Sequence, residues 1–213
     1  PVAERPVEEL EKEILAELKN SEAQIIVNYL PVGSQKAVEF WANIAIKSRC
    51  AFINAMPVFI ASDRKWAEKF QKAGVPIIGD DMKGMLGATI VHRVLAKLTV
   101  DRGAELSNTY QLNVGGNTDF INMLERERLV SKKISKTESV QSQLEVPLDS
   151  GHIHIGPSDY VKFLGNTKIA FMRLRGKMWA DIPYDIEVKL EVDDKANAGG
   201  IIADAVRIAK VAL

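Results

Sequence analysis

The hydrophobic pattern of the first hundred residues is the feature that most constrains the fold. Short apolar runs at 25–30, 51–55 and 75–78 have the length and composition of buried strands. Between and after them, apolar side chains recur every three or four residues, as in amphipathic helices, and the last such stretch begins at about Gly84. Strands that alternate with helices predict parallel βαβ units. We therefore expect a doubly wound α/β sheet, whose ligands bind beyond the carboxyl ends of the strands.

After about Arg102 the pattern changes to that of a sheet with one solvent-exposed face. A strand is predicted over 109–114, and apolar residues alternate strictly with polar ones from Ile182 to Val192. A further apolar helix is expected to open at about Asn197. The sequence therefore predicts two subdomains with a boundary near residue 104.

The composition argues against several classes of protein. The chain carries 28 Lys plus Arg and 28 Asp plus Glu, so its net charge is zero. It lacks the positive field that broad binding to nucleic acids or membrane surfaces requires. No apolar run approaches the ~20 residues that cross a bilayer. The single cysteine, Cys50, cannot form a disulfide within the chain. We expect a cytoplasmic globular protein.

Three loops are candidates for ligand binding. The first runs from Gly79 to Gly84 and leads into a helix, where backbone N–H groups beside Lys83 would form a phosphate cradle; a capped helix with solvated acids is the alternative. The second, 113–119, has paired glycines that let a ligand approach the backbone, and a plain turn is the alternative. In the third, 131–136, Lys132 and Lys136 share a helix face, which a solvated charge run would also explain.

The histidines give weaker signals. His152 and His154 would share one face of a strand and can ligate a metal, but no third ligand stands in evident spacing, so we expect surface histidines. His92, inside the fourth helix, is predicted to be structural. The chain has no GxGxxG fingerprint, no GxxxxGK[ST] loop and no CxxC pair. Spacing alone predicts an α/β protein that binds a phosphorylated or nucleotide ligand.

Taken together, these loops resemble the signatures of the myo-inositol-1-phosphate synthase family, in its shorter prokaryotic branch. The likeness covers nearly the whole chain from about residue 25 and keeps the family's order. One such motif would be weak evidence, whereas six in order are strong. The six segments are 27–34, 79–83, 113–119, 131–136, 165–168 and 193–194.

The resemblance implies an NAD-dependent isomerase. Enzymes of this family convert D-glucose 6-phosphate to 1D-myo-inositol 3-phosphate by oxidation at C5, enolisation, intramolecular aldol cyclisation and reduction by the same NADH. The resemblance further implies a partial Rossmann NAD-binding domain over 1–104, a sheet-rich catalytic and tetramerisation domain over 105–195, and a helix over 196–213 that returns to the Rossmann domain. It implies a homotetramer, and in some members a mono- or divalent cation.

The site residues follow from the motifs one by one. By resemblance, Lys132, Lys136 and Lys168 are catalytic lysines, which suits the oxyanions that develop on the sugar. The resemblance assigns further catalytic positions to Asp81, Asp119 and Asp194. It assigns cofactor contacts to Ser34, Asn54, Asp80, Asn113, Gly116 and Asn117, and the substrate phosphate to Lys83, Gly84 and Thr89. It assigns no residue to a metal.

Some features depart from the family pattern. The first βα unit with its Gly-rich turn is expected before Pro1, and a segment with a further lysine beyond Leu213. Gly84-Met85-Leu86 replaces polar residues often seen in the phosphate loop, and Lys195 follows Asp194 where a small residue is common. Two alternatives remain open: another NAD-dependent sugar-phosphate oxidoreductase, or a truncated, inactive relative that serves as an oligomeric binding module.

Overall fold

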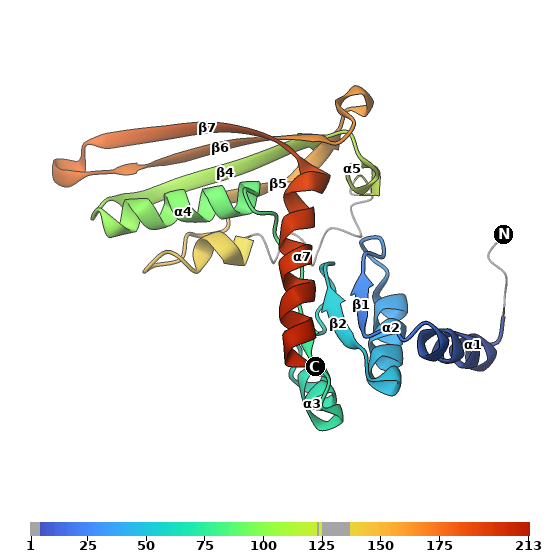
Figure 1. Ribbon diagram of the computed structural model, residues 1–213. Helices are drawn as coiled ribbons and strands as arrows, with labels where there is room; N and C mark the ends of the chain where they lie inside the picture. The colour runs from blue at the N-terminus through green and yellow to red at the C-terminus, as the bar shows by residue number, and fades with distance from the viewer. Residues whose placement is uncertain (1–4, 123, 125–136) are drawn as a thin grey trace. The chain divides into compact units, whose positions relative to one another are not determined.

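The computed structural model describes residues 5–122, 124 and 137–213. Its internal contacts divide the chain into two compact units, and Figure 1 labels their elements. The first unit comprises Pro1–Met82 and Ile202–Leu213, and the second comprises Lys83–Ile201.

The first unit is built on a three-stranded parallel sheet. In spatial order its strands are β1 (Ile25–Asn28), β2 (Ala51–Asn54) and β3 (Ile77–Ile78). The helices that precede or connect these strands are α1 (Val7–Asn20), α2 (Gln35–Ser48) and α3 (Arg64–Ala73). The parallel βαβ arrangement predicted from the alternating periods is therefore confirmed.

Both faces of this sheet are covered, because alternate residues of β2 belong to different cores. Phe52 packs among Val38 of α2 and Phe70 of α3. Ile53 packs against Ala205 and Ala209 of α7 (Asp194–Ala212), whose residues from Ile202 onward belong to this unit. Successive side chains of a strand point to opposite faces, so a strand buried on both faces is a continuous apolar run. This accounts for the run at 51–54.

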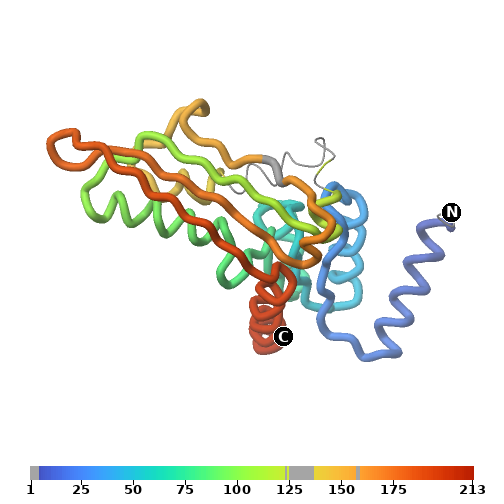
Figure 2. Tube along the Cα trace, turned by 90° about the horizontal axis from the view of Figure 1, so that it is seen from above, coloured from blue at the N-terminus to red at the C-terminus, as the bar shows by residue number. Residues whose placement is uncertain are grey.

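The second unit is built on a mixed four-stranded sheet in the order β5-β4-β6-β7. In chain order its strands are β4 (Glu105–Gly115), β5 (Ile153–Tyr160), β6 (Thr167–Lys177) and β7 (Pro183–Asp193). β5 runs parallel to β4, whereas the β4–β6 and β6–β7 pairs are antiparallel. Figure 2 shows the long strands side by side. The shorter elements are α4 (Ala88–Asp101), α5 (Thr118–Asn122), a helix over 137–141, and the 3-10 turns η2 (Lys162–Leu164) and η3 (Trp179–Asp181).

Helix α4 covers one face of the mixed sheet (Figure 1). Ala88 packs with Val188 of β7 in one cluster, and Ala96 packs with Ile186 in another. The apolar row predicted along β7 is therefore half-buried against the chain's own helix. These contacts group α4 with the second unit and divide the units after Met82, whereas the change of pattern lies near residue 104. The functional domains expected over 1–104, 105–195 and 196–213 stay a prediction.

Two helices begin at other residues than the pattern predicts. α4 begins at Ala88 rather than near Gly84, because 83–87 form an irregular loop with Gly87 extended at the helix start. α7 begins at Asp194 rather than near Asn197, because the Asp193 carboxylate accepts a hydrogen bond from the Ala196 N–H and caps the first turn. Among the described helices, none combines the length and the apolar character needed to cross a membrane.

Candidate active site

Lys168, Asp194 and Asn117 form a polar cluster at one end of the mixed sheet. The Lys168 ammonium Nζ donates to Asp194 Oδ1 at 3.1 Å, and Asn117 Nδ2 donates to Asp194 Oδ2 at 3.1 Å. Both carboxylate oxygens are therefore engaged. The three residues come from β6, from the loop before α5 and from the start of α7, so the fold joins three of the predicted site motifs.

The two adjacent acids before α7 have different partners. Asp193 caps the helix through the Ala196 N–H, whereas the backbone N–H of Asp194 donates to Asn166 O at 3.0 Å and its side chain binds Lys168. A carboxylate in the first turn also interacts favourably with the helix dipole. Local capping thus explains why Asp194, rather than its neighbour, belongs to the cluster.

Asn117 is held by the helix that it caps. Its Oδ1 accepts hydrogen bonds from the backbone N–H groups of Asp119 at 3.0 Å and Phe120 at 3.3 Å, which leaves its Nδ2 for Asp194. This places the predicted acid Asp119 in the first turn of α5. The second candidate loop is thus a capped helix start, and one of its side chains also belongs to the cluster.

The paired glycines of this loop make room for the protein itself. A Cβ on Gly115 would lie 2.4 Å from the ring of Phe120, and one on Gly116 would lie 2.4 Å from Gly165 N. The buried Phe120 ring lies beneath Lys168, whose Nζ is 5.9 Å from its centroid. The close approach predicted for a ligand is therefore made by Phe120 and by Gly165. The cofactor contact of Gly116 stays a prediction.

A ladder of buried polar side chains runs along β4. His92 of α4 lies 2.7 Å from Thr109 Oγ1 through Nε2 and 3.3 Å from Gln111 Oε1 through Nδ1. Gln111 Nε2 lies 2.9 Å from Asn113 Oδ1, and Asn113 Nδ2 has no partner. Burial, which disfavours the imidazolium form, lowers the pKa of His92 to about 4. Polar residues at alternate strand positions are a sequence signal for this ladder, but no candidate motif joins its members.

The predicted phosphate loop is held by Asn197. The backbone N–H of Leu86 donates to Asn197 Oδ1 at 2.8 Å, and that of Met85 donates to Asn197 O at 3.1 Å. Two N–H groups of the expected cradle are thus already used. Lys83 and Gly84 are half-buried, and Thr89 is buried. No local pattern indicates the role of Asn197, because it lies 111 residues from Leu86.

In the first unit, Asn54 and Asp80 form a network at the carboxyl ends of the strands. The Asp80 carboxylate accepts from the backbone N–H groups of Ile60, Ala61 and Ser62 at 3.0, 3.1 and 3.0 Å, and from Asn54 Nδ2 at 2.7 Å. These four bonds occupy the four acceptor positions of a carboxylate. Asn54 also accepts from Asn28 Nδ2 at 2.8 Å. Both residues predicted to touch the cofactor therefore hold neighbouring loops in place.

Ser34 and Asp81, both in the first unit, have other surroundings. Ser34 stands at the start of α2 and its side chain makes no capping hydrogen bond. Asp81 lies in the loop after β3, where its backbone N–H donates to Met56 O at 3.0 Å. Lys132 and Lys136 lie outside the described residues.

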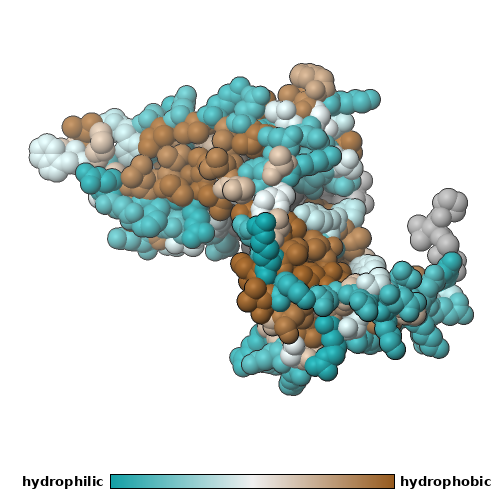
Figure 3. Space-filling view, in the orientation of Figure 1, coloured by the Kyte–Doolittle hydropathy of each residue, from teal (hydrophilic) through white to brown (hydrophobic). Residues whose placement is uncertain are grey.

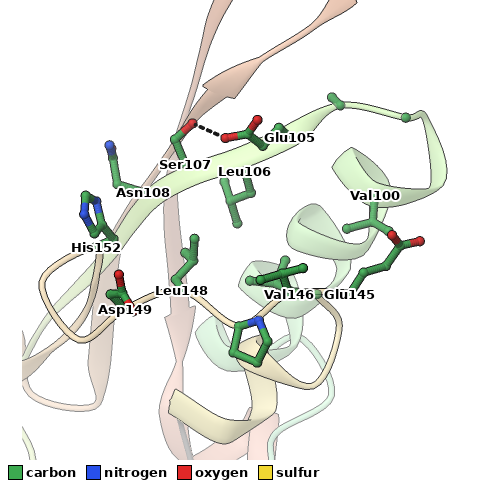
Figure 4. Close-up of a pocket in the computed structure, with 14 residues that line it drawn as sticks. Val100, Glu105, Leu106, Ser107, Asn108, Glu145, Val146, Leu148, Asp149 and His152 are labelled. Carbon is green, nitrogen blue, oxygen red and sulfur yellow. Dashed lines mark hydrogen bonds between the residues drawn. The ribbon is translucent and has the colours of Figure 1, made fainter.

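An open groove of about 850 Å³ lies elsewhere in the second unit (Figure 4). It is formed by the end of α4, the start of β4 and the segment 144–149, and His152 lines it. Its carboxylates Glu105, Glu145 and Asp149 would repel a phosphate. None of the predicted site residues lines this groove. In the ranges that the structure describes, no group of three or more His, Cys, Asp or Glu side chains is placed to hold a metal ion.

Comparison with known proteins places the chain in a family. A sequence model of myo-inositol-1-phosphate synthase matches residues 87–195. The inositol-3-phosphate synthase of Mycobacterium tuberculosis (strain CDC 1551 / Oshkosh) is 56% identical over 200 residues, which is 94% of this chain and 54% of that protein. The chain belongs to the myo-inositol-1-phosphate synthase family. It spans about half the length of such relatives.

Other members of the synthase family agree with this assignment. The inositol-3-phosphate synthase of Mycolicibacterium smegmatis is 55% identical over 204 residues, covering 94% of this chain and 56% of that protein. A crystal structure of a myo-inositol-1-phosphate synthase-related protein from Thermotoga maritima superposes with a TM-score of 0.84 at 22% identity, covering 98% of this chain and 60% of that one. At that identity the structural match supports the fold alone. The predicted family and the α/β fold are both confirmed.

Proposed function

We propose that this chain carries catalytic residues of an inositol-3-phosphate synthase. The reaction is the NAD-dependent isomerisation of D-glucose 6-phosphate to 1D-myo-inositol 3-phosphate by oxidation, enolisation, intramolecular aldol cyclisation and reduction. The observation that carries the proposal is the cluster of Lys168, Asp194 and Asn117, in which three family motifs from distant segments meet. Relatives that are named inositol-3-phosphate synthase, at 56% and 55% identity, support it.

Lys168 is proposed to stabilise negative charge on the sugar oxygens. Charge develops on oxygen as C5 is oxidised, as the enolate forms and as the aldol bond closes. A fixed ammonium stabilises such oxyanions because it needs no reorganisation when the charge appears. The side chains of Lys168 and Asp194 are only 21% and 24% exposed, so solvent screens this pair less than a surface pair. Asp194 orients the ammonium.

The other proposed catalytic residues rest on the family motifs. Lys132 and Lys136, outside the described residues, are proposed to stabilise oxyanions or move protons with Lys168. In the sequence, Asp119 lies two residues after Asn117, which caps α5, and Asp81 lies directly after Asp80. We assign these two acids to tuning the lysines or to the nicotinamide end of the cofactor.

The proposed cofactor contacts are assigned residue by residue. Bound NAD supplies the hydride acceptor for the first step and the hydride donor for the last. Ser34, at a helix start without a side-chain cap, fits a ligand rich in hydrogen-bonding groups. Asn113, whose buried amide group has one end without a partner, is assigned to the cofactor or to the sugar beside it. Asn117 and Gly116 complete the proposed contacts, whereas Asn54 and Asp80 are assigned to shaping the surrounding loops.

The substrate phosphate is proposed to bind at the loop before α4. Because Asn197 occupies the N–H groups of Met85 and Leu86, the phosphate contacts are assigned to Lys83, to the Gly84 backbone and to the helix start at Thr89.

We further propose that the enzyme is a homotetramer in the cytoplasm, with no nucleic-acid or membrane partner. A mono- or divalent cation is included where the full-length enzyme needs one.

The decisive experiment replaces Lys168 by Met in the full-length enzyme and measures conversion of glucose 6-phosphate. We expect kcat to fall roughly 10²–10³-fold, as when one oxyanion donor is lost, while NAD still binds. Lys189→Met is the matched control, since Lys189 is an exposed β7 lysine whose ion pair with Glu191 lies outside the cluster. Wild-type turnover in Lys168→Met would end the assignment. A wild-type enzyme that leaves glucose 6-phosphate unchanged would end the proposed function.

A further inference from the structure

The buried ladder on β4 ends at Asn113, where one polar atom has no partner. Thr109, Gln111 and Asn113 alternate along the strand and so share one face, where they meet His92 of α4. His92 is 0% exposed, and Gln111 and Asn113 are 1% exposed. Within the described ranges, Asn113 Nδ2 is the one buried side-chain nitrogen or oxygen without a hydrogen bond. A buried unpaired donor is costly and rare, so its presence needs a cause.

The hydroxyl group of Thr109 determines which nitrogen of His92 carries the hydrogen. Thr109 Oγ1 lies 2.7 Å from Arg173 O and 2.7 Å from His92 Nε2. A backbone carbonyl can only accept, and a hydroxyl has a single hydrogen. Thr109 therefore donates to Arg173 and accepts from His92, so the hydrogen is on Nε2.

The other ring nitrogen then determines how the Gln111 amide is turned. Burial keeps the pKa of His92 at about 4, so the ring is neutral at pH 7 and Nδ1 is an acceptor. Its neighbour is the Gln111 amide at 3.3 Å. The nitrogen and oxygen of such an amide occupy nearly equivalent positions, so the network decides between them. Only the NH2 group of Gln111 satisfies Nδ1.

The orientation of the Gln111 amide in turn determines that of the Asn113 amide. With its NH2 group on His92, Gln111 presents its oxygen across the 2.9 Å contact with Asn113. Asn113 then donates its own NH2 group to Gln111. The ladder ends in the Asn113 carbonyl oxygen, an acceptor, in place of a buried donor without a partner.

The free end of the ladder lies beside the proposed active site. Across the β4–β6 pair, Asn113 is opposite Ala170 and Gly115 is opposite Lys168. Asn113 and Lys168 are therefore diagonal neighbours on one face, a relation that separates side chains by roughly 7–8 Å. An oxygen at this position complements an ammonium and accepts from a hydroxyl group, whereas an NH2 group would do neither.

We propose that His92 is a positioning residue, which through Gln111 holds the Asn113 oxygen toward the site, where it accepts a hydrogen bond from a ligand hydroxyl group. The ligand class is a polyol or sugar. The identification of this ligand as the sugar phosphate rests on the proposed function. The orientation of the amide groups along the ladder does not depend on it.

The first test uses the unmodified full-length protein without ligand. ¹⁵N NMR of the histidine ring at neutral pH should show His92 as the neutral tautomer with hydrogen on Nε2 and a bare Nδ1. An imidazolium, or the tautomer with hydrogen on Nδ1, would overturn the proposal. The measurement depends neither on activity nor on the folding of a variant.

A second test reverses the orientation of the Gln111 amide by a substitution at Asn113, the end of the ladder away from His92. In Asn113→Asp the carboxylate can only accept, so Gln111 must turn its NH2 group to it and its oxygen to Nδ1. His92 should then be doubly protonated at neutral pH. Asn108→Asp adds the same charge on the same strand outside the ladder, and it should leave the ring unchanged. Ring signals in Asn113→Asp that match the wild type would refute the coupling.

The ligand part is tested with D-glucose 6-phosphate. In Gln111→Leu the Asn113 amide can turn, so one hydrogen bond to the sugar is lost. KM should rise about 5–10-fold, the effect of one ordinary hydrogen bond, while kcat changes less. An unchanged KM would remove the ligand role of the ladder. Absence of turnover in the wild type would instead refute the proposed function, and it would not affect the proposed orientation of the amide groups in the ladder.

Discussion

The Asp80 carboxylate shows how much one residue can hold in place. It accepts three backbone N–H groups and the Asn54 amide, whereas an Asn can accept at only one of its two positions. We expect Asp80→Asn to lower the free energy of unfolding by about 2–4 kcal/mol in urea titrations. Asp101→Asn, which loses only an exposed pair with Lys97, should cost about 0.5 kcal/mol or less. Equal losses in both variants would contradict the assigned role of Asp80.

His92 should make stability depend on pH in one window. Its folded pKa is about 4, below the ordinary value of 6.5, so the unfolded chain binds more protons between these values. The free energy of unfolding should therefore rise by roughly 3 kcal/mol from pH 4 to pH 6.5 because of this residue, and stay level above it. Urea titrations of wild type and His92→Leu across this range measure the difference. A wild-type curve that parallels the variant would show that His92 does not titrate as described.

At the scale of elements, Asn197 joins the loop 83–87 to the first turns of α7 by hydrogen bonds. A Cβ on Gly84 would lie 2.7 Å from Asn197 Nδ2, so Gly84→Ala should destabilise the protein by about 1–3 kcal/mol. Asn197→Ala removes the obstructing side chain. In a double-mutant cycle, the loss from Gly84→Ala should shrink when Asn197 is already Ala.

The control for this cycle is Gly151→Ala, which meets nothing within 4 Å and should change stability little in either background. Strictly additive effects of the Gly84 and Asn197 changes would show that the contact carries no energy. The same cycle followed by KM for glucose 6-phosphate tests whether Asn197 shapes the proposed phosphate site.

At the scale of the whole molecule, exposed apolar side chains indicate self-association. Figure 3 shows apolar side chains gathered over the region of α4 and β7. Val94 and Leu98 of α4 are 59% and 49% exposed, and Ile182 before β7 is 51% exposed. Isolated apolar residues are ordinary on surfaces, but a group of them marks interaction sites. Light scattering of the full-length protein should therefore show an oligomer.

A paired substitution tests which surface makes that oligomer. Val94→Glu with Leu98→Glu should shift the mass toward the monomer, because burying two carboxylates without partners is unfavourable. Val7→Glu on α1, which is equally exposed, should leave the mass unchanged. A wild-type monomer, or dissociation by Val7→Glu alone, would contradict the prediction.

The candidate site was predictable where its residues lie in short motifs. Lys168, Asp194 and Asn117 were each named from such segments, and the fold brings them within hydrogen-bonding distance. His92 was predicted only to be structural and Gln111 was not predicted at all, because their contact joins a helix to a strand and leaves only a weak trace, the alternation of polar residues at 109, 111 and 113. Asn197 was missed because its partners lie more than a hundred residues away.

The sequence by itself determined the elements and the family. Periods of two and of about 3.6 residues report which face of a strand or helix is buried, and that is a local property of the chain. Only the tertiary structure decided which polar groups pair. It placed the four donors around Asp80, closed the phosphate loop with Asn197 and connected His92 to Asn113. Such pairings depend on distances between segments that are remote in the chain, and no local period encodes those distances.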